Sequence, residues 1–71
     1  SPTGERVVDA SYVLLFNAHH EPVIFLLPPR RFGSRWLLEL STAEPEAGGR
    51  PYLARAELEV GARSIVVLRR S

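Results

Sequence analysis

Two neighbouring histidines followed by a glutamate are the residues of this 71-residue chain that most directly suggest chemistry. His19, His20 and Glu21 offer the imidazole and carboxylate groups that bind zinc. Three consecutive residues rarely converge on one ion, because adjacent side chains of an extended backbone point to opposite faces. The chain has no cysteine and no third histidine to complete a ligand set. We therefore expect no metal site and no cofactor, and we interpret the segment as a loop in which a histidine hydrogen-bonds to the backbone.

A second group of chemically suggestive residues interleaves arginines with Phe32 and Trp36 over residues 30–36. This composition is typical of platforms that stack single-stranded nucleic acid or sugar rings. Trp36, however, opens an apolar run and is favoured as a core residue, and Tyr52 beside Pro51 is favoured as a lid on the core. Nine arginines are nearly balanced by eight acids, which gives a formal net charge of +1. A dominant basic stripe is missing, so we expect neither nucleic acid nor a membrane surface as a partner.

Catalysis would need a nucleophile beside a base, or paired groups whose environments separate their pKa values. Glu57 and Glu59 alternate with Leu58 and Val60, so both carboxylates are expected to face water from one strand. No glycine-rich phosphate loop, zinc pattern or nucleophile elbow occurs. We therefore expect this chain not to be an enzyme by itself and assign it no catalytic residue.

The elements that position these groups are strands. Short apolar runs, rich in β-branched and aromatic residues and bounded by turn formers, cover residues 12–16, 23–27, 36–40, 56–60 and 65–68. Residues 41–44 could begin a helix, but Pro45 limits it to one turn. The pattern predicts an all-β fold, a small antiparallel β-sandwich of about five to six strands, in one domain over residues 1–71.

Short connections predict the pairing of these strands. The loops at residues 17–21 and 61–63 are of hairpin length, so we expect 12–16 to pair with 23–27 and 56–60 to pair with 65–68. Asn17 is expected to adopt a left-handed conformation at the end of its strand. Residues 42–51 are predicted to form a surface loop, and residues 1–5 a turn that remains from an earlier strand.

The chain has more apolar residues than so small a core requires. Hydrophobic residues make up 45% of the sequence, whereas a domain of this size buries only about 60% of its surface on folding. Neither disulfides nor a metal supports the fold. Apolar runs of five or six residues are far short of the ~20 that span a bilayer, and the absence of cysteine is typical of a reducing, cytoplasmic location. The start at Ser1 and the short length suggest a piece of a larger chain.

The sequence also resembles a known family. Residues 7–23, the Leu27-Pro28-Pro29 segment with Trp36, and the closing residues 63–70 resemble the C-terminal β domain of bacterial glycogen debranching enzymes, which are isoamylase-type members of the α-amylase superfamily. The most specific part is Phe16-Asn17-Ala18-His19-His20-Glu21-Pro22. Residues 42–52 match least, and Ala10 stands where the family often has a second acid.

This resemblance implies a parent enzyme whose (β/α)₈ barrel hydrolyses α-1,6 branch linkages in glycogen or limit dextrin. The superfamily's catalytic carboxylates lie on the barrel, and none of their motifs occurs in this chain. Retaining hydrolysis needs two carboxyl groups about 5 Å apart, and no acid pair is so placed here. The resemblance therefore implies a noncatalytic domain that stabilises the barrel and packs on it, with α-glucan as a partner only through the parent.

The docking hypothesis makes a prediction about strand faces. Alternate residues form two classes, of which one closes the core and the other covers it or docks, and the pattern does not say which. The first class is Leu14, Phe16, Ile24 and Leu26, and the second is Val13, Leu15, Phe25 and Leu27.

Two other functions remain open. One is an α-glucan-binding module in which Trp36, Tyr52 or His20 stacks on glucose rings. The other is a small nucleic-acid binder that uses residues 30–36, against which the near-neutral charge argues.

Overall fold

A computed structural model describes residues 4–71, and it is all-β as expected. Each strand is antiparallel to its neighbours. The strands are β1 (Gly4–Val8), β2 (Tyr12–Asn17), β3 (Val23–Leu26), β4 (Arg35–Ser41), β5 (Pro51–Leu53), β6 (Glu57–Val60) and β7 (Ser64–Arg70), and a single 3₁₀ turn covers Arg30–Phe32. Within residues 4–71, no helix has the length and apolar character needed to cross a membrane.

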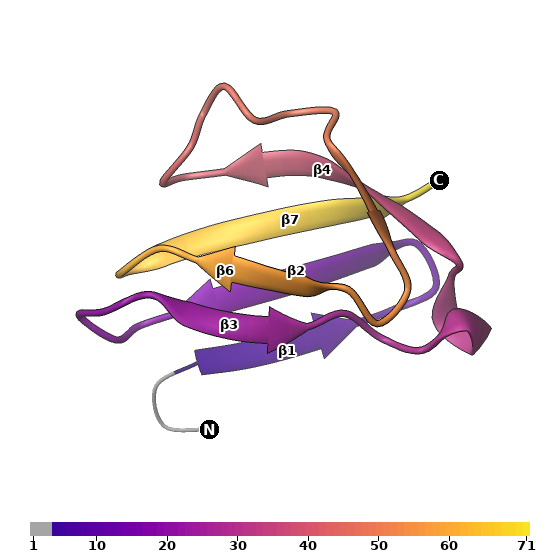
Figure 1. The fold of residues 1–71 in the computed structure, drawn as a ribbon, viewed down its shortest axis with the longest axis horizontal. Coiled ribbons are helices and arrows are strands. Elements are labelled where there is room, and N and C mark those ends of the chain that lie inside the picture. Colours follow the sequence, from indigo (N-terminus) through magenta and orange to yellow (C-terminus); the bar gives the residue numbers. More distant parts are fainter. Residues whose placement is uncertain (1–3) are drawn as a thin grey trace.

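The strands form two layers. A five-stranded sheet has the order β1-β2-β7-β4-β5, and a two-stranded sheet pairs β3 with β6. Figure 1 shows β3 and β6 lying over the β1-β2-β7 side of the larger sheet, and β6 contacts both β2 and β7 across the layers. The predicted class, a small antiparallel sandwich, is consistent with this arrangement.

The predicted hairpins are wrong. β2 pairs with β1 and β7 rather than with β3, and β6 pairs with β3 rather than with β7. Both edges of β2 are occupied within the larger sheet, so the loops at residues 17–21 and 61–63 carry the chain from one sheet to the other. A short loop between two antiparallel strands is compatible with either connection, and its length alone does not distinguish them.

Two strands were not predicted. Gly4 and Glu5 belong to β1, so the expected turn does not extend over them, and its residues 1–3 lie outside the described part of the chain. Tyr52 lies in β5, at the edge of the sheet beside β4, rather than in a loop. The expected surface loop after β4 ends where Pro51 begins β5.

The two classes of alternate residues differ in burial. Val13, Leu15 and Leu27 are fully buried, and Phe25 packs against the core from its edge. The other class is exposed, from 37% at Leu14 to 63% at Ile24. The buried core consists of Val13, Leu15, Leu27, Trp36, Leu38, Ala47, Leu58, Val60, Val66 and Leu68.

A β-bulge in β4 changes which of its residues face the core. Leu38 lies opposite Leu68 in β7, but Leu40 lies opposite Val67, so Glu39 is the extra residue. Without this insertion Leu40 would face inward with Trp36 and Leu38, because every second residue shares a face. The bulge instead leaves Leu40 50% exposed.

Candidate functional site

Asn17 organises the loop that contains both histidines. Its side chain is fully buried, and Nδ2 lies 2.9, 3.1 and 3.0 Å from the carbonyl oxygens of Glu21, Val60 and Gly61. Its Oδ1 accepts a hydrogen bond from the His19 backbone N–H at 2.8 Å. One amide therefore joins the two loops that cross between the sheets. Asn17 does not have the left-handed backbone that was expected, and its side chain performs this role instead.

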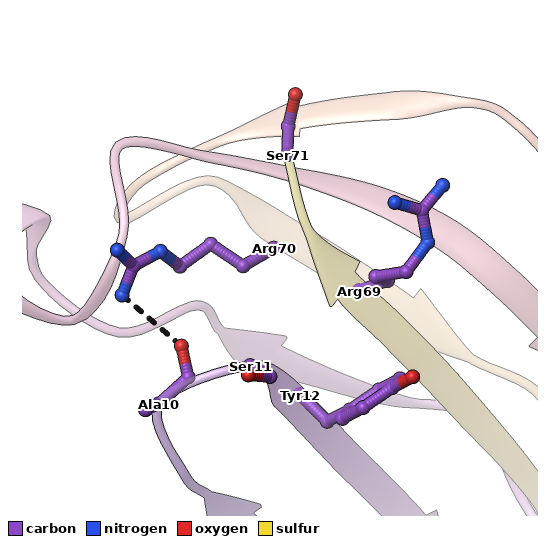
Figure 2. A pocket seen from close by; sticks show the side chains of 6 residues that line it. All are labelled: Ala10, Ser11, Tyr12, Arg69, Arg70 and Ser71. Carbon is purple, nitrogen blue, oxygen red and sulfur yellow. Dashed lines mark hydrogen bonds between the residues drawn. The ribbon is translucent and has the colours of Figure 1, made fainter.

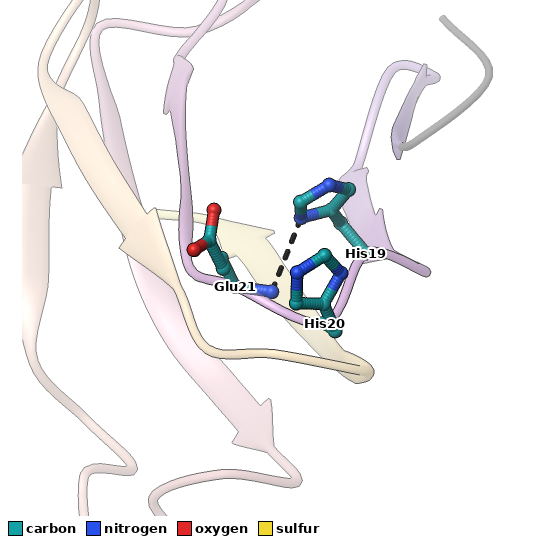
Figure 3. A group of neighbouring side chains, drawn as sticks. All are labelled: His19, His20 and Glu21. Carbon is teal, nitrogen blue, oxygen red and sulfur yellow. Dashed lines mark hydrogen bonds between the residues drawn. The ribbon is translucent and has the colours of Figure 1, made fainter.

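His19, His20 and Glu21 lie close together in this loop (Figure 3). Their possible ligand atoms lie within 4.8 Å of one another. The two imidazole rings stack with centroids 4.3 Å apart, so the expectation that they point to opposite faces is wrong. That expectation assumed an extended backbone, whereas these residues form a bend outside any strand.

The hydrogen bonds of this loop do not suit metal binding. His19 Nδ1 accepts a hydrogen bond from the Glu21 backbone N–H at 3.1 Å, as the loop interpretation predicts. A neutral imidazole that accepts at Nδ1 carries its proton at Nε2, so both nitrogens are engaged or protonated. His19 would have to break this bond to ligate through Nδ1, or to move the proton onto Nδ1 and ligate through Nε2. The geometry fits a structural loop better than an ion site.

The aromatic residues considered for sugar stacking do not form a platform. Trp36 is fully buried, and its Nε1 has no hydrogen-bond partner among residues 4–71. Tyr52 lies opposite Trp36 on the same face of the sheet and packs half-buried against the core. His20 is exposed in the histidine loop beyond the end of β2, which begins at Tyr12 and ends at Asn17. The three residues therefore present no shared exposed surface.

The arginine-aromatic segment forms a turn at the opposite end of the sandwich. The Arg31 guanidinium lies 5.0 Å from the centre of the Phe32 ring and covers it. The nearby C-terminal residues border a hollow of about 470 Å³ beside β2 (Figure 2). There Arg70 Nη1 donates to the Ala10 carbonyl oxygen at 3.1 Å, which fixes one guanidinium against the adjoining turn.

Asp9 shapes that turn. Its Oδ1 accepts hydrogen bonds from the backbone N–H groups of Ser11 and Tyr12, both at 2.8 Å. These bonds, that of Ser11 first, lower the pKa of the Asp9 carboxyl because they stabilise its charged form. Asp9 is therefore a local turn former.

The carboxylates of β4 and β6 lie at the surface. Glu57 and Glu59 are exposed on the outer side of β6, as the alternation predicts. Among residues 4–71 the one ion pair joins Arg69 Nε to Glu39 Oε1 at 3.2 Å, with both side chains about half exposed.

The chain is similar to known proteins over nearly its whole length. The chain is 41% identical over 69 residues, 96% of its length, to proteins of Mycobacterium tuberculosis and Mycobacterium bovis named glycogen operon protein GlgX homolog. The chain resembles the C-terminal part of GlgX homologues. The resemblance to glycogen debranching enzymes predicted from the sequence is thereby confirmed. No protein-family model matches the chain.

The match to GlgX homologues covers only a small part of those proteins. The chain spans about a tenth of their length, since the aligned region is 10% of each. The histidine loop and its buried Asn17 lie in the segment that carries the most specific resemblance. This segment joins the two sheets.

Proposed function

We propose that this chain is a noncatalytic domain of a glycogen debranching enzyme, and that it stabilises the catalytic barrel by packing on it. The observation that carries the proposal is the 41% identity to GlgX homologues over nearly all of the chain but only a tenth of their length. In this proposal a segment that corresponds to so small a part of a long enzyme has a structural role. In this proposal α-1,6-linked glucan is bound and hydrolysed elsewhere in the parent.

Removal of the domain from a full-length chain tests this proposal. We expect the truncated enzyme to lose much of its soluble, folded fraction and to unfold at a lower temperature, because an apolar interface becomes exposed. The fraction that stays folded should keep its KM for glycogen. Unchanged thermal stability together with a raised KM would contradict the stabilising role and favour glucan binding.

The isolated chain separates the stabilising role from the alternative of a glucan-binding module. Stacking on glucose rings requires exposed aromatic faces, and Trp36 has none. We expect the chain to stay in the supernatant when glycogen is sedimented, and Trp36 fluorescence to stay unchanged when maltooligosaccharide is added. Saturable cosedimentation with glycogen would favour the binding module.

A further inference from the structure

One apolar row crosses the outer side of the five-stranded sheet. In the register, Val7 lies opposite Leu14, Leu14 opposite Val67, and Val67 opposite Leu40, which places one apolar side chain on each of β1, β2, β7 and β4. Residues directly opposite one another share a face. All four side chains therefore point away from the core.

A second apolar pair lies beside this row. Phe16 lies opposite Ile65, and these two side chains are 40% and 36% exposed. We call the six side chains Val7, Leu14, Phe16, Leu40, Ile65 and Val67 the outer sheet face. Leu37 lies opposite Pro51, which continues the apolar character onto β5, where Leu53 lies opposite Arg35.

Charged side chains border the apolar row, and two of them form an ion pair. Glu5 lies opposite Phe16 on the edge strand β1, and Arg35 lies opposite Leu53 at the start of β4; within residues 4–71 neither forms an ion pair. Arg69 lies between Tyr12 and Leu37 in the register, and its guanidinium pairs with Glu39, the extra residue of the bulge. A partner that covers these last two charges would bury a formed ion pair and not an isolated charge, which is much less costly.

The two-stranded sheet presents a different outer side. Ile24 lies opposite Glu59 and Leu26 lies opposite Glu57, so apolar side chains alternate with carboxylates. Neither carboxylate forms an ion pair within residues 4–71. Burial of unpaired carboxylates is costly. On the β3-β6 side they lie directly opposite both apolar side chains, whereas on the five-stranded sheet the unpaired Glu5 lies on the edge strand β1. The outer sheet face therefore suits a partner better than the β3-β6 side does.

The size of the outer sheet face indicates its occupant. The five strands contain 28 residues, which at about 3.4 Å per residue and about 4.8 Å between strands cover roughly 460 Å². A matching surface brings the total buried area to roughly 900 Å², within the 600–1,500 Å² of interfaces between domains of one chain. Separate proteins that form stable complexes bury about 1,200–2,000 Å². The area therefore favours a covalently linked neighbour over a second copy.

We propose that the outer sheet face is the surface on which the remainder of the parent chain packs, while the β3-β6 side remains in solvent. This inference rests on the proposed function and adds the face and the chemistry of the contact. The contacting surface of the parent is apolar, and it supplies no charge opposite the Arg69–Glu39 pair.

A matched pair of substitutions in a full-length chain tests the choice of face. Leu14→Arg places a charge in the outer sheet face, and Ile24→Arg places the same charge on the β3-β6 side. Leu14 is 37% and Ile24 63% exposed in the domain alone. We therefore expect both variants to keep the urea midpoint of the isolated 71-residue chain.

In the full-length chain the two variants should differ. We expect Leu14→Arg to lower the thermal midpoint and to raise the rate of proteolytic release of the domain about tenfold or more, because a docked arginine would be desolvated. Ile24→Arg should leave both quantities unchanged. If Leu14→Arg unfolds the isolated chain, Leu40→Arg replaces it, since Leu40 is 50% exposed on the same face.

The outcomes separate this inference from the proposed function. If deletion of the domain destabilises the parent but only Ile24→Arg promotes its release, the domain docks through the other face and the inference is wrong. Equal effects of the two variants, or no effect of either, would also overturn it. If deletion itself leaves the parent's stability unchanged, the stabilising role fails first.

Discussion

Replacement of Asn17 tests whether the histidine loop is a structural element. The amide has two hydrogens for three carbonyl oxygens at 2.9–3.1 Å, so one bond is shared, and its oxygen accepts a fourth bond. Asn17→Ala removes all four of these bonds; the one to Val60 is buried, whereas the other partners lie at partly buried positions that water can reach. A lost hydrogen bond costs about 0.5–1.5 kcal/mol, and since water can replace part of the loss we expect about 2–4 kcal/mol in total.

Asn17→Asp should cost more than Asn17→Ala at pH 7, although it preserves the shape of the side chain. The introduced carboxyl keeps the oxygen that accepts from His19 but places a second oxygen against three carbonyls. This environment disfavours the charged form, so the folded-state pKa of the new group lies above its unfolded value of about 3.9. A raised pKa favours folding at low pH. The difference in free energy of unfolding between Asn17→Asp and Asn17→Ala should therefore shrink as the pH falls below that raised pKa.

Urea unfolding followed by Trp36 fluorescence measures these differences, because the indole is fully buried in the folded chain. A chain of this length has a total stability of about 4–10 kcal/mol, so either substitution removes a large share. A cost below about 1 kcal/mol for Asn17→Ala would refute the argument. So would an Asn17→Asp variant that is as stable as the wild-type chain at pH 7.

Three further substitutions test the core, a tight turn and a titrating group. Leu15→Ala should cost about 2–5 kcal/mol in urea unfolding, whereas Leu14→Ala, its exposed neighbour, should cost about 1 kcal/mol or less; equal costs would contradict the assignment of the faces. Gly33→Ala places a Cβ 2.9 Å from Trp36 Cζ2 at a residue with φ of 155°, and an expected loss of about 1–3 kcal/mol is measurable in the same assay. The lowered pKa of Asp9 predicts that its contribution is present above its unfolded pKa and is lost as the pH falls through the folded one. The advantage of the wild-type chain over Asp9→Asn should therefore be constant near neutral pH and decline in acid, and a difference independent of pH would contradict it.

The alternation of apolar residues predicted the fold class and the two sets of side chains, because a strand's period of two is independent of its neighbours. It did not predict β1 or β5. In β1 the residues Gly4, Glu5 and Arg6 form no apolar run. This segment is a strand because it pairs with β2. β5 is three residues long and is defined by its pairing with β4. The residue pattern within β5 does not predict this pairing.

The candidate site was predicted less well than the fold. His20, Trp36 and Tyr52 were chosen by residue type, but Trp36 and Tyr52 lie on the inner face of β4 and β5 and His20 lies beyond the far end of β2. The outer sheet face was foreseen only as one of two classes, because sequence parity does not say which class meets the opposite sheet. The bulge that adds Leu40 to that face depends on the register with β7 and has no signal in β4 alone.

The wrong hairpins and the correct alternation classes have a common cause. Within β2 and within the segment of β3, every second side chain points to the same side, so the residues of each class lie together. The loop after Asn17 keeps the odd-numbered residues on the core side in both segments, since Leu15 and Leu27 both face the core. A hairpin would have placed both strands in one sheet, whereas the crossing loop places their core-facing residues on opposite walls. At the crossing the buried Asn17 amide donates to the carbonyl oxygens of Val60 and Gly61, and so ties the end of β2 to the end of β6. The hydrogen bonds that Asn17 and His19 form in the most specific sequence segment are therefore explained by this change of sheet.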